Sequence, residues 1–234
     1  WDLLYVVFMA IVILLIAHAI IMAALAKKNL DRPTGDGRRV VRHESIDRLF
    51  HWLMAASILV LIFTGVAPIL GLRVAWLDIH WISGLLLTFL VAAHIIRASF
   101  WQDFKSMLLM PKDFAEPFDS SRKPGKYYFE QKGMHWAVTV VALAVIVTGV
   151  LMFMQIDSPF WDRTNSMAED QLGLVFLLHG LSTLALVALA ATHIYFALRP
   201  EKIFYTRSMI SGWMSEDEMA ANHDTAKWSP KEAE

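Results

Sequence analysis

The chain has 234 residues, of which 56% are hydrophobic and only 18% charged, a composition too apolar for an ordinary soluble domain. It contains no cysteine, which excludes disulfides, covalently attached c-type haem and any iron–sulfur cluster held by this chain. The formal net charge is −1 and no basic helix stands out, so nothing indicates a nucleic-acid partner.

Five nearly uncharged stretches follow one another along the chain, each long enough to cross the apolar core of a bilayer, which takes roughly 20 residues. They are residues 3–26, 49–70, 77–99, 134–156 and 172–198. The first has no basic region before it and no small-residue cleavage site after it, so we expect a retained membrane helix rather than a signal peptide. The predicted fold is an all-α integral membrane protein, a five-span helical bundle in the lipid bilayer.

Lysine and arginine gather in the connections between spans one and two and between spans three and four. They are Lys27, Lys28, Arg32, Arg38, Arg39 and Arg42 in the first connection and Lys105, Lys112, Arg122, Lys123, Lys126 and Lys132 in the second. The positive-inside rule places both connections in the cytoplasm. We therefore expect a multi-pass protein of the cytoplasmic (inner) membrane, with its N-terminus outside and its C-terminal tail in the cytoplasm.

An internal repeat covers the four later spans. Residues 48–52 and the triplet Thr64-Gly65-Val66 recur as residues 132–136 and the triplet Thr148-Gly149-Val150. In both copies a His-Trp pair opens the span and a Thr-Gly-Val triplet lies near its far end. This duplication predicts two related helix pairs that pack into one core.

The repeat divides the chain into three parts. An extra N-terminal transmembrane helix occupies residues 1–28, and a duplicated four-helix core occupies residues 40–198, with repeats at approximately 48–99 and 132–198. The cytoplasmic tail is residues 199–234.

Six histidines are matched between the two repeats. They are His51, His80 and His94 in the first repeat and His135, His179 and His193 in the second. The last two of each repeat are fourteen residues apart, a helical rise of about 21 Å over nearly four turns, so they share one helix face at different depths. His80 and His179 are predicted at an outer level and the other four at an inner, cytoplasmic level.

An isolated histidine on an apolar helix is more often a hydrogen-bonded packing residue than a metal ligand. Ionisable groups inside a bilayer are costly and usually functional, and six histidines matched in spacing favour a ligand role. Neutral imidazole is an axial ligand of haem iron, and two imidazoles fill both axial positions, which suits electron transfer rather than oxygen binding. The histidines therefore predict haem sites for transmembrane electron transfer.

Over residues 40–228 the chain resembles the cytochrome b subunits of respiratory formate dehydrogenases and, more distantly, of membrane-bound nickel–iron hydrogenases. The resemblance is carried by residues 42–52, 64–66, His80 with Gly84, residues 125–127, Gln131-Lys132, and His179 with residues 193–195. It implies that four histidines hold two b-type haems, with His80 and His179 on the outer haem and His51 and His193 on the inner one.

The chain departs from that family in its extra N-terminal span and in having both His94 and His135. If the repeats are related by a pseudo-twofold axis along the membrane normal, the inner pair His51 and His193 maps onto His135 and His94, which predicts a third haem. The alternative is that these two histidines are relics of duplication, hydrogen-bonded to each other, to a propionate or to a quinone.

Several other polar residues are candidates for the surroundings of the inner haem. They are Arg42, Arg48, Arg97, Lys132 and, on the first span, His18. The cationic side chains could pair with haem propionates or guide protons to a quinone, and the alternative is a basic rim that anchors the spans at the headgroups. His18 is interpreted as a packing or quinone-facing residue, and His43 and His223 as loop and tail histidines.

The predicted function is that of a membrane cytochrome b subunit that passes electrons between a partner redox subunit and the quinone pool, with no substrate chemistry of its own. The resemblance implies a partner with an iron–sulfur or haem centre at the outer face, formate dehydrogenase first, with a hydrogenase, a sulfur-compound reductase or a multihaem cytochrome as alternatives. The complex could assemble into a higher oligomer. From a different class, the bundle could be a haem-free anchor or a transporter whose histidines relay protons.

Overall fold

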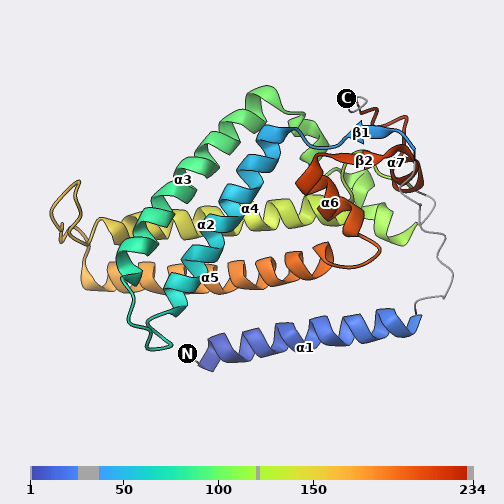
Figure 1. The fold of residues 1–234 in the computed structure, drawn as a ribbon. Coiled ribbons are helices and arrows are strands. Elements are labelled where there is room, and N and C mark those ends of the chain that lie inside the picture. The colour runs from blue at the N-terminus through green and yellow to red at the C-terminus, as the bar shows by residue number, and fades with distance from the viewer. Residues whose placement is uncertain (1, 26–36, 120–121, 231–234) are drawn as a thin grey trace. The chain divides into compact units, whose positions relative to one another are not determined.

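The structure, a computed structural model, describes residues 2–25, 37–119 and 122–230 and is mainly helical (Figure 1). The long helices are α1 (Asp2–Leu25), α2 (Ser45–Val66), α3 (Trp76–Trp101), α4 (Phe129–Phe153) and α5 (Glu169–Ala197). Among the described residues, α2 to α5 are long and apolar enough to cross a membrane, and α1 carries a shorter apolar stretch, Met9–Met22. These helices confirm the predicted all-α integral membrane fold. Lys27, Lys28 and Arg32 lie outside the described residues.

The end of α2 differs from the sequence prediction. We expected this span to continue to residue 70, but the helix ends at Val66 and residues 67–71 form turns. Proline disfavours helical backbone in the residue before it, so Pro68 ends the helix at this point. Gly71 follows with a φ of +67°, a left-handed conformation that glycine adopts without strain.

The chain divides into two compact units. The terminal unit comprises Trp1–Arg48, Lys105–His135 and Ala188–Glu234, and the helical unit comprises Leu49–Phe104 and Trp136–Val187. The helical unit therefore holds most of α2, α3, α4 and α5. Each unit is described separately below.

The helical unit has a small interior and an extensive apolar surface. Leu87 of α3 and Leu186 of α5 are buried, whereas Phe63, Phe89 and Leu177 are more than half exposed. Apolar residues surround these helices on all sides, as expected where the outward face meets lipid rather than water. Aromatic rings pack at one end of the unit, where Trp81 stacks on Phe153 with ring centroids 5.1 Å apart.

The terminal unit contains a small sheet that the sequence did not predict. Strand β1 (Arg39–Val41) pairs antiparallel with β2 (Trp213–Ser215), which lies between the helices α6 (Ile203–Ser211) and α7 (Glu216–Asn222) of the tail (Figure 1). The predicted tail is therefore joined to the segment before α2. In the connection between α3 and α4, two 3-10 helices span Phe104–Met107 and Pro111–Phe118.

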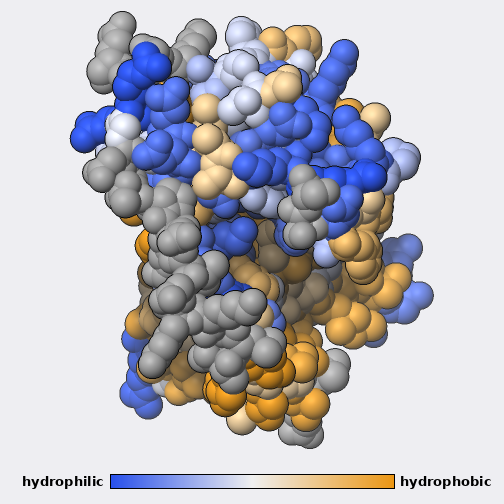
Figure 2. Space-filling model, turned by 90° about the vertical axis from the view of Figure 1, so that its right-hand side faces the viewer, coloured by the Kyte–Doolittle hydropathy of each residue, from blue (hydrophilic) through white to orange (hydrophobic). Residues whose placement is uncertain are grey.

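We call the sheet with α6 and α7 the cap. Its core consists of Val40, Met214 and Met219, packed against Phe204, Tyr205 and Trp228. The Ser215 hydroxyl accepts a hydrogen bond from the backbone N–H of Glu218, and the Glu218 carboxylate accepts one from the Ser215 N–H, which fixes the start of α7. Figure 2 shows hydrophilic side chains over the upper part of the drawn face, where β1, β2 and α7 lie. Such a surface is typical of a segment in water.

Gly212 connects α6 to β2 and holds the cap against the residues before α2. Its φ of +93° is left-handed, and its carbonyl accepts hydrogen bonds from the backbone N–H groups of Arg42 and His43 at 2.8 and 3.0 Å. A Cβ atom at this position would lie 3.0 Å from the His43 carbonyl oxygen. Position 212 therefore requires glycine for both conformation and space.

Gly212→Ala is expected to destabilise the cap by about 1–3 kcal/mol, the typical cost of a side chain in strained left-handed backbone. Hydrogen exchange of the amides in residues 203–222 would measure the effect as faster exchange. Gly173→Ala is the matched control, because its Cβ atom would meet nothing within 4 Å. Equal protection in the two variants would contradict this account of Gly212.

Candidate functional site

The structure brings His80 and His179 together in the helical unit. His80 lies in the second turn of α3 and His179 lies on α5, and their ring centroids are 6.4 Å apart with the ring planes at 72°. These are the two histidines that the sequence placed at the outer level. They come from different copies of the repeat.

Each of these imidazoles contacts the Thr-Gly-Val triplet of its own repeat. The Thr64 hydroxyl lies 2.8 Å from Nδ1 of His80, and the Thr148 hydroxyl lies 2.9 Å from Nδ1 of His179. The following glycines lie beside the rings, because a Cβ atom on Gly149 would be 3.4 Å from Cε1 of His179, within ordinary van der Waals contact. The sequence marked these triplets as repeated but did not assign the threonines a role. The matched position of the two threonines in both repeats was the feature of the sequence that could have indicated such a role.

The arrangement of His80 and His179 fits a haem. A metal ion bonds imidazole nitrogen at about 2 Å, and that nitrogen lies about 1 Å from the ring centre, so two imidazoles on opposite sides of one iron have centroids about 6 Å apart. The observed 6.4 Å agrees with this value. Because Nδ1 of each ring is engaged with threonine, Nε2 is the nitrogen of each ring that would bind iron.

The four histidines predicted at the inner level divide between the units. His51 and His94 lie in the helical unit, where the His51 ring packs edge-on against Trp52 and the His94 ring centroid is 6.3 Å from that of Phe50. His135 and His193 lie in the terminal unit. The pairings of His51 with His193 and of His94 with His135 stay predictions. Arg97 lies on α3, three residues after His94.

His18 joins α1 to α5 within the terminal unit. Its Nδ1 atom lies 2.8 Å from the Tyr195 hydroxyl, and its ring packs edge-on against Tyr195 and Phe196 with centroids 5.7 and 5.5 Å apart. Tyr195 follows His193 by two residues, and two helical residues turn through about 200°, so Tyr195 lies on nearly the opposite face of α5. His18 therefore contacts the face of α5 directed away from His193.

Arg42 is buried in the terminal unit with a relative exposure of 3%. Its guanidinium donates hydrogen bonds to Nε2 of His223 at 3.0 Å and to the Lys126 carbonyl at 2.9 Å, and it lies over the Tyr205 ring. These contacts tie together the segment before α2, the segment before α4 and the tail. Arg48 similarly donates to the Ile210 carbonyl and to the Ser45 hydroxyl.

His223 was interpreted as a tail histidine, but the structure buries it in the cap, at 1% exposure. Its Nδ1–H donates to the Gly125 carbonyl at 2.6 Å, so Nε2 carries the lone pair that accepts from Arg42. Burial, together with the Arg42 charge, lowers the pKa of His223 from 6.5 to about 4. The sequence lacked a signal for this site, because the contacts join segments far apart in the chain.

The cap is expected to weaken as the pH falls from about 6.5 to about 4. In this window the unfolded tail binds a proton at His223 that the folded cap does not, so the free energy of unfolding falls, by about 3 kcal/mol over the whole window. Hydrogen exchange of residues 203–222, corrected for the chemical exchange rate at each pH, would show the loss. An unchanged pH dependence in the His223→Gln variant would contradict the assignment.

Lys132, at the start of α4, forms a buried ion pair. Its ammonium lies 2.8 Å from a carboxylate oxygen of Asp113, and both side chains are almost inaccessible. Burial would raise the pKa of Asp113, but the hydrogen bonds from Lys132 and from the Met110 backbone N–H, with the Lys132 charge, outweigh it and lower that pKa. Lys132 therefore has a protein carboxylate as its partner, and the pair links α4 to the connection before it.

Asp113→Ala is expected to destabilise the protein by roughly 3–5 kcal/mol, because it leaves the Lys132 ammonium buried without a counter-charge. Removing both charges with Asp113→Ala and Lys132→Met should recover most of the loss. Asp119→Ala, which breaks the exposed pair with Arg122, is the control and should change little. Thermal unfolding of the purified protein would measure all three. A double variant no more stable than Asp113→Ala would contradict the prediction.

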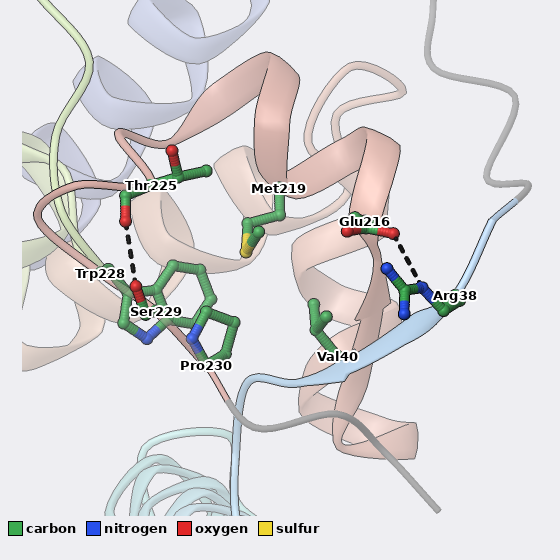
Figure 3. Close-up of a pocket in the computed structure, with 8 residues that line it drawn as sticks. All are labelled: Arg38, Val40, Glu216, Met219, Thr225, Trp228, Ser229 and Pro230. Atoms are coloured by element: carbon green, nitrogen blue, oxygen red, sulfur yellow. Dashed lines mark hydrogen bonds and ion pairs between the residues drawn. The ribbon is translucent and has the colours of Figure 1, made fainter.

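A small pocket lies in the cap, lined by residues of β1, α7 and the end of the tail (Figure 3). Figure 3 shows the Arg38–Glu216 ion pair at one side and the Trp228 ring at another. The cavity measures about 160 Å³, well below the roughly 300–1,000 Å³ typical of sites for drug-sized ligands. It is too small to hold a porphyrin.

Comparison with known proteins identifies the family of the chain. The family described as prokaryotic cytochrome b561 matches residues 42–212, a segment that contains all six repeat histidines. The cytochrome b556 subunit of formate dehydrogenase from Haemophilus influenzae is 26% identical over 211 residues, covering 82% of this chain and 80% of that protein. The family implies haem b in a helical membrane bundle, as the histidines and apolar helices predicted. This chain belongs to the prokaryotic cytochrome b561 family and is a multi-pass membrane protein of haem b electron transfer.

Proposed function

We propose that the chain is the haem b subunit of a respiratory oxidoreductase, and that it carries electrons between a partner redox subunit and membrane quinone. The observation that carries the proposal is the placement of His80 and His179, whose rings are separated as two axial ligands of one iron require. Haem iron supplies the one-electron chemistry when it is bound. Two imidazoles would complete its coordination, which favours electron transfer over oxygen binding.

The chain's own residues would position two or three haems in the apolar interior of the bundle. His80 and His179 would hold the outer haem, His51 and His193 the inner one, and His94 with His135 a third. The apolar helices around them exclude water, which leaves few polar groups to reorganise when an electron arrives. Arg97 and Arg48 are the cationic candidates for propionate contacts at the inner level.

The partner subunit is proposed from the relative. That protein is the cytochrome b556 subunit of a formate dehydrogenase, so formate dehydrogenase is the first candidate partner here. Because this chain has no cysteine, any iron–sulfur cluster must be held by the partner. We place the chain in the cytoplasmic membrane, with the outer haem facing the partner and the quinone near the inner haem.

A reduced-minus-oxidised visible spectrum of the purified protein tests the proposal. We expect sharp b-type bands and, by pyridine haemochrome assay, two or three haems per chain. Colourless protein would instead support a haem-free anchor or a histidine-relay transporter. Mass spectrometry of the native complex would identify the partner, and a complex without a redox subunit would contradict the electron-transfer role.

A further inference from the structure

Two threonine hydroxyls contact His80 and His179, the proposed ligands of the outer haem, and their remaining hydrogen bonds are the same in both repeats. Thr64 Oγ1 donates to the Val60 carbonyl at 2.8 Å, and Thr148 Oγ1 donates to the Ala144 carbonyl at 2.7 Å. In each case the acceptor lies four residues earlier on the threonine's own helix. The same hydrogen-bond geometry is therefore found on both α2 and α4.

These bonds favour one direction for the contact with histidine. A hydroxyl has one proton, so a threonine that donates to its own helix can only accept from a second neighbour. The Thr64 oxygen therefore accepts from Nδ1–H of His80, and the Thr148 oxygen accepts from Nδ1–H of His179. With the proton on Nδ1, the lone pair of each ring lies on Nε2. The hydrogen-bond network thus assigns the tautomer that can bind iron.

The threonines have little competition from water. Thr64 is 1% exposed and Thr148 is 7% exposed, so water does not compete with either hydroxyl for the imidazole beside it. A ligating imidazole that donates its second N–H to an acceptor is held in orientation and becomes a stronger electron donor to the metal. Removal of such an acceptor typically costs 10–100-fold in metal affinity or activity.

We infer that Thr64 and Thr148 are positioning residues that fix the tautomer and orientation of His80 and His179 and lower the midpoint potential of the haem between them. The inference rests on the proposed function, because it requires these histidines to be haem ligands. Greater electron donation by the imidazoles stabilises ferric iron relative to ferrous iron. The two threonines, on different helices, would therefore act on the same haem and in the same direction.

Thr64→Val and Thr148→Val test the inference, because valine keeps the shape and removes the acceptor. Potentiometric titration of the visible bands should show a higher midpoint potential for one haem component in both variants, and the same component in each. That component is the one lost from His80→Ala. Electron paramagnetic resonance of the oxidised protein should show a changed low-spin signal for that haem alone. Thr64→Ser and Thr148→Ser keep the hydroxyl and should restore the original values.

Thr88→Val is the matched control, because the Thr88 hydroxyl donates to the Gly84 carbonyl on the helix that carries His80. It should leave the potential unchanged. If a valine variant retains no outer haem, retention by its serine counterpart supports the inference and loss from both variants overturns it. An unchanged or lower potential in the valine variants, with the outer haem present, also overturns it and leaves the proposed function intact. Wild-type protein without haem would overturn the proposed function itself.

Discussion

Replacing either His80 or His179 with alanine is expected to remove the same haem from the purified protein. Each substitution takes away one of the two proposed axial ligands, whose rings lie 6.4 Å apart. Haem content by pyridine haemochrome should fall by about one third in a three-haem protein and by about one half in a two-haem protein. Reduction of quinone by the assembled complex should be lost with it, since the outer haem would receive the partner's electrons.

The double variant should lose no more haem than either single variant, because both residues would serve one iron and their effects would not be additive. His18→Ala is the control, since His18 contacts Tyr195 and Phe196 on α5 and should leave the haem content unchanged. Full haem content in His80→Ala or in His179→Ala would show that the pair does not ligate haem.

The second large effect is expected at His94 and His135. If the repeat extends to a third haem, His94→Ala and His135→Ala each remove one haem per chain, and the remaining visible spectrum is identical in the two variants. Iron analysis with pyridine haemochrome would count the haems. His43→Ala serves as the control because His43 lies in the segment before α2, outside the matched histidines.

Unchanged haem content after both substitutions would contradict the third site and favour hydrogen-bonding roles for His94 and His135. Loss of haem from one variant alone would contradict their pairing. The inner pair provides an internal reference, because His51→Ala and His193→Ala should each remove a haem whose spectrum differs from that lost at His94.

The helices and the outer histidine pair could be predicted from the sequence because their signals are local and repeated. Apolar length predicted each span to within a few residues, and Pro68 explains the early end of α2. Span lengths and the positions of charged residues predicted that His80 and His179 lie at one level, and the structure brings their rings together. Matched histidines in two repeats of one chain support a ligand role, whereas a single isolated histidine does not.

The cap and the threonine contacts could not be predicted in this way. Strands β1 and β2 have three residues each and come from opposite ends of the chain, so no periodicity marks them. Arg42 and His223 are both buried and are hydrogen-bonded to each other. The residues next to each of them in the sequence are not apolar enough to indicate that burial. The direction of the Thr64 hydrogen bond depends on the carbonyl that receives its proton, which requires three-dimensional coordinates.

The most direct measurement of the central claim is an experimental density map of the purified protein, at a resolution that shows side chains. The account predicts a porphyrin between His80 and His179, with Nε2 of each ring directed at the iron and Nδ1 directed at Thr64 or Thr148. A map in which the two rings contact each other or turn toward lipid, with no macrocycle between them, would contradict it.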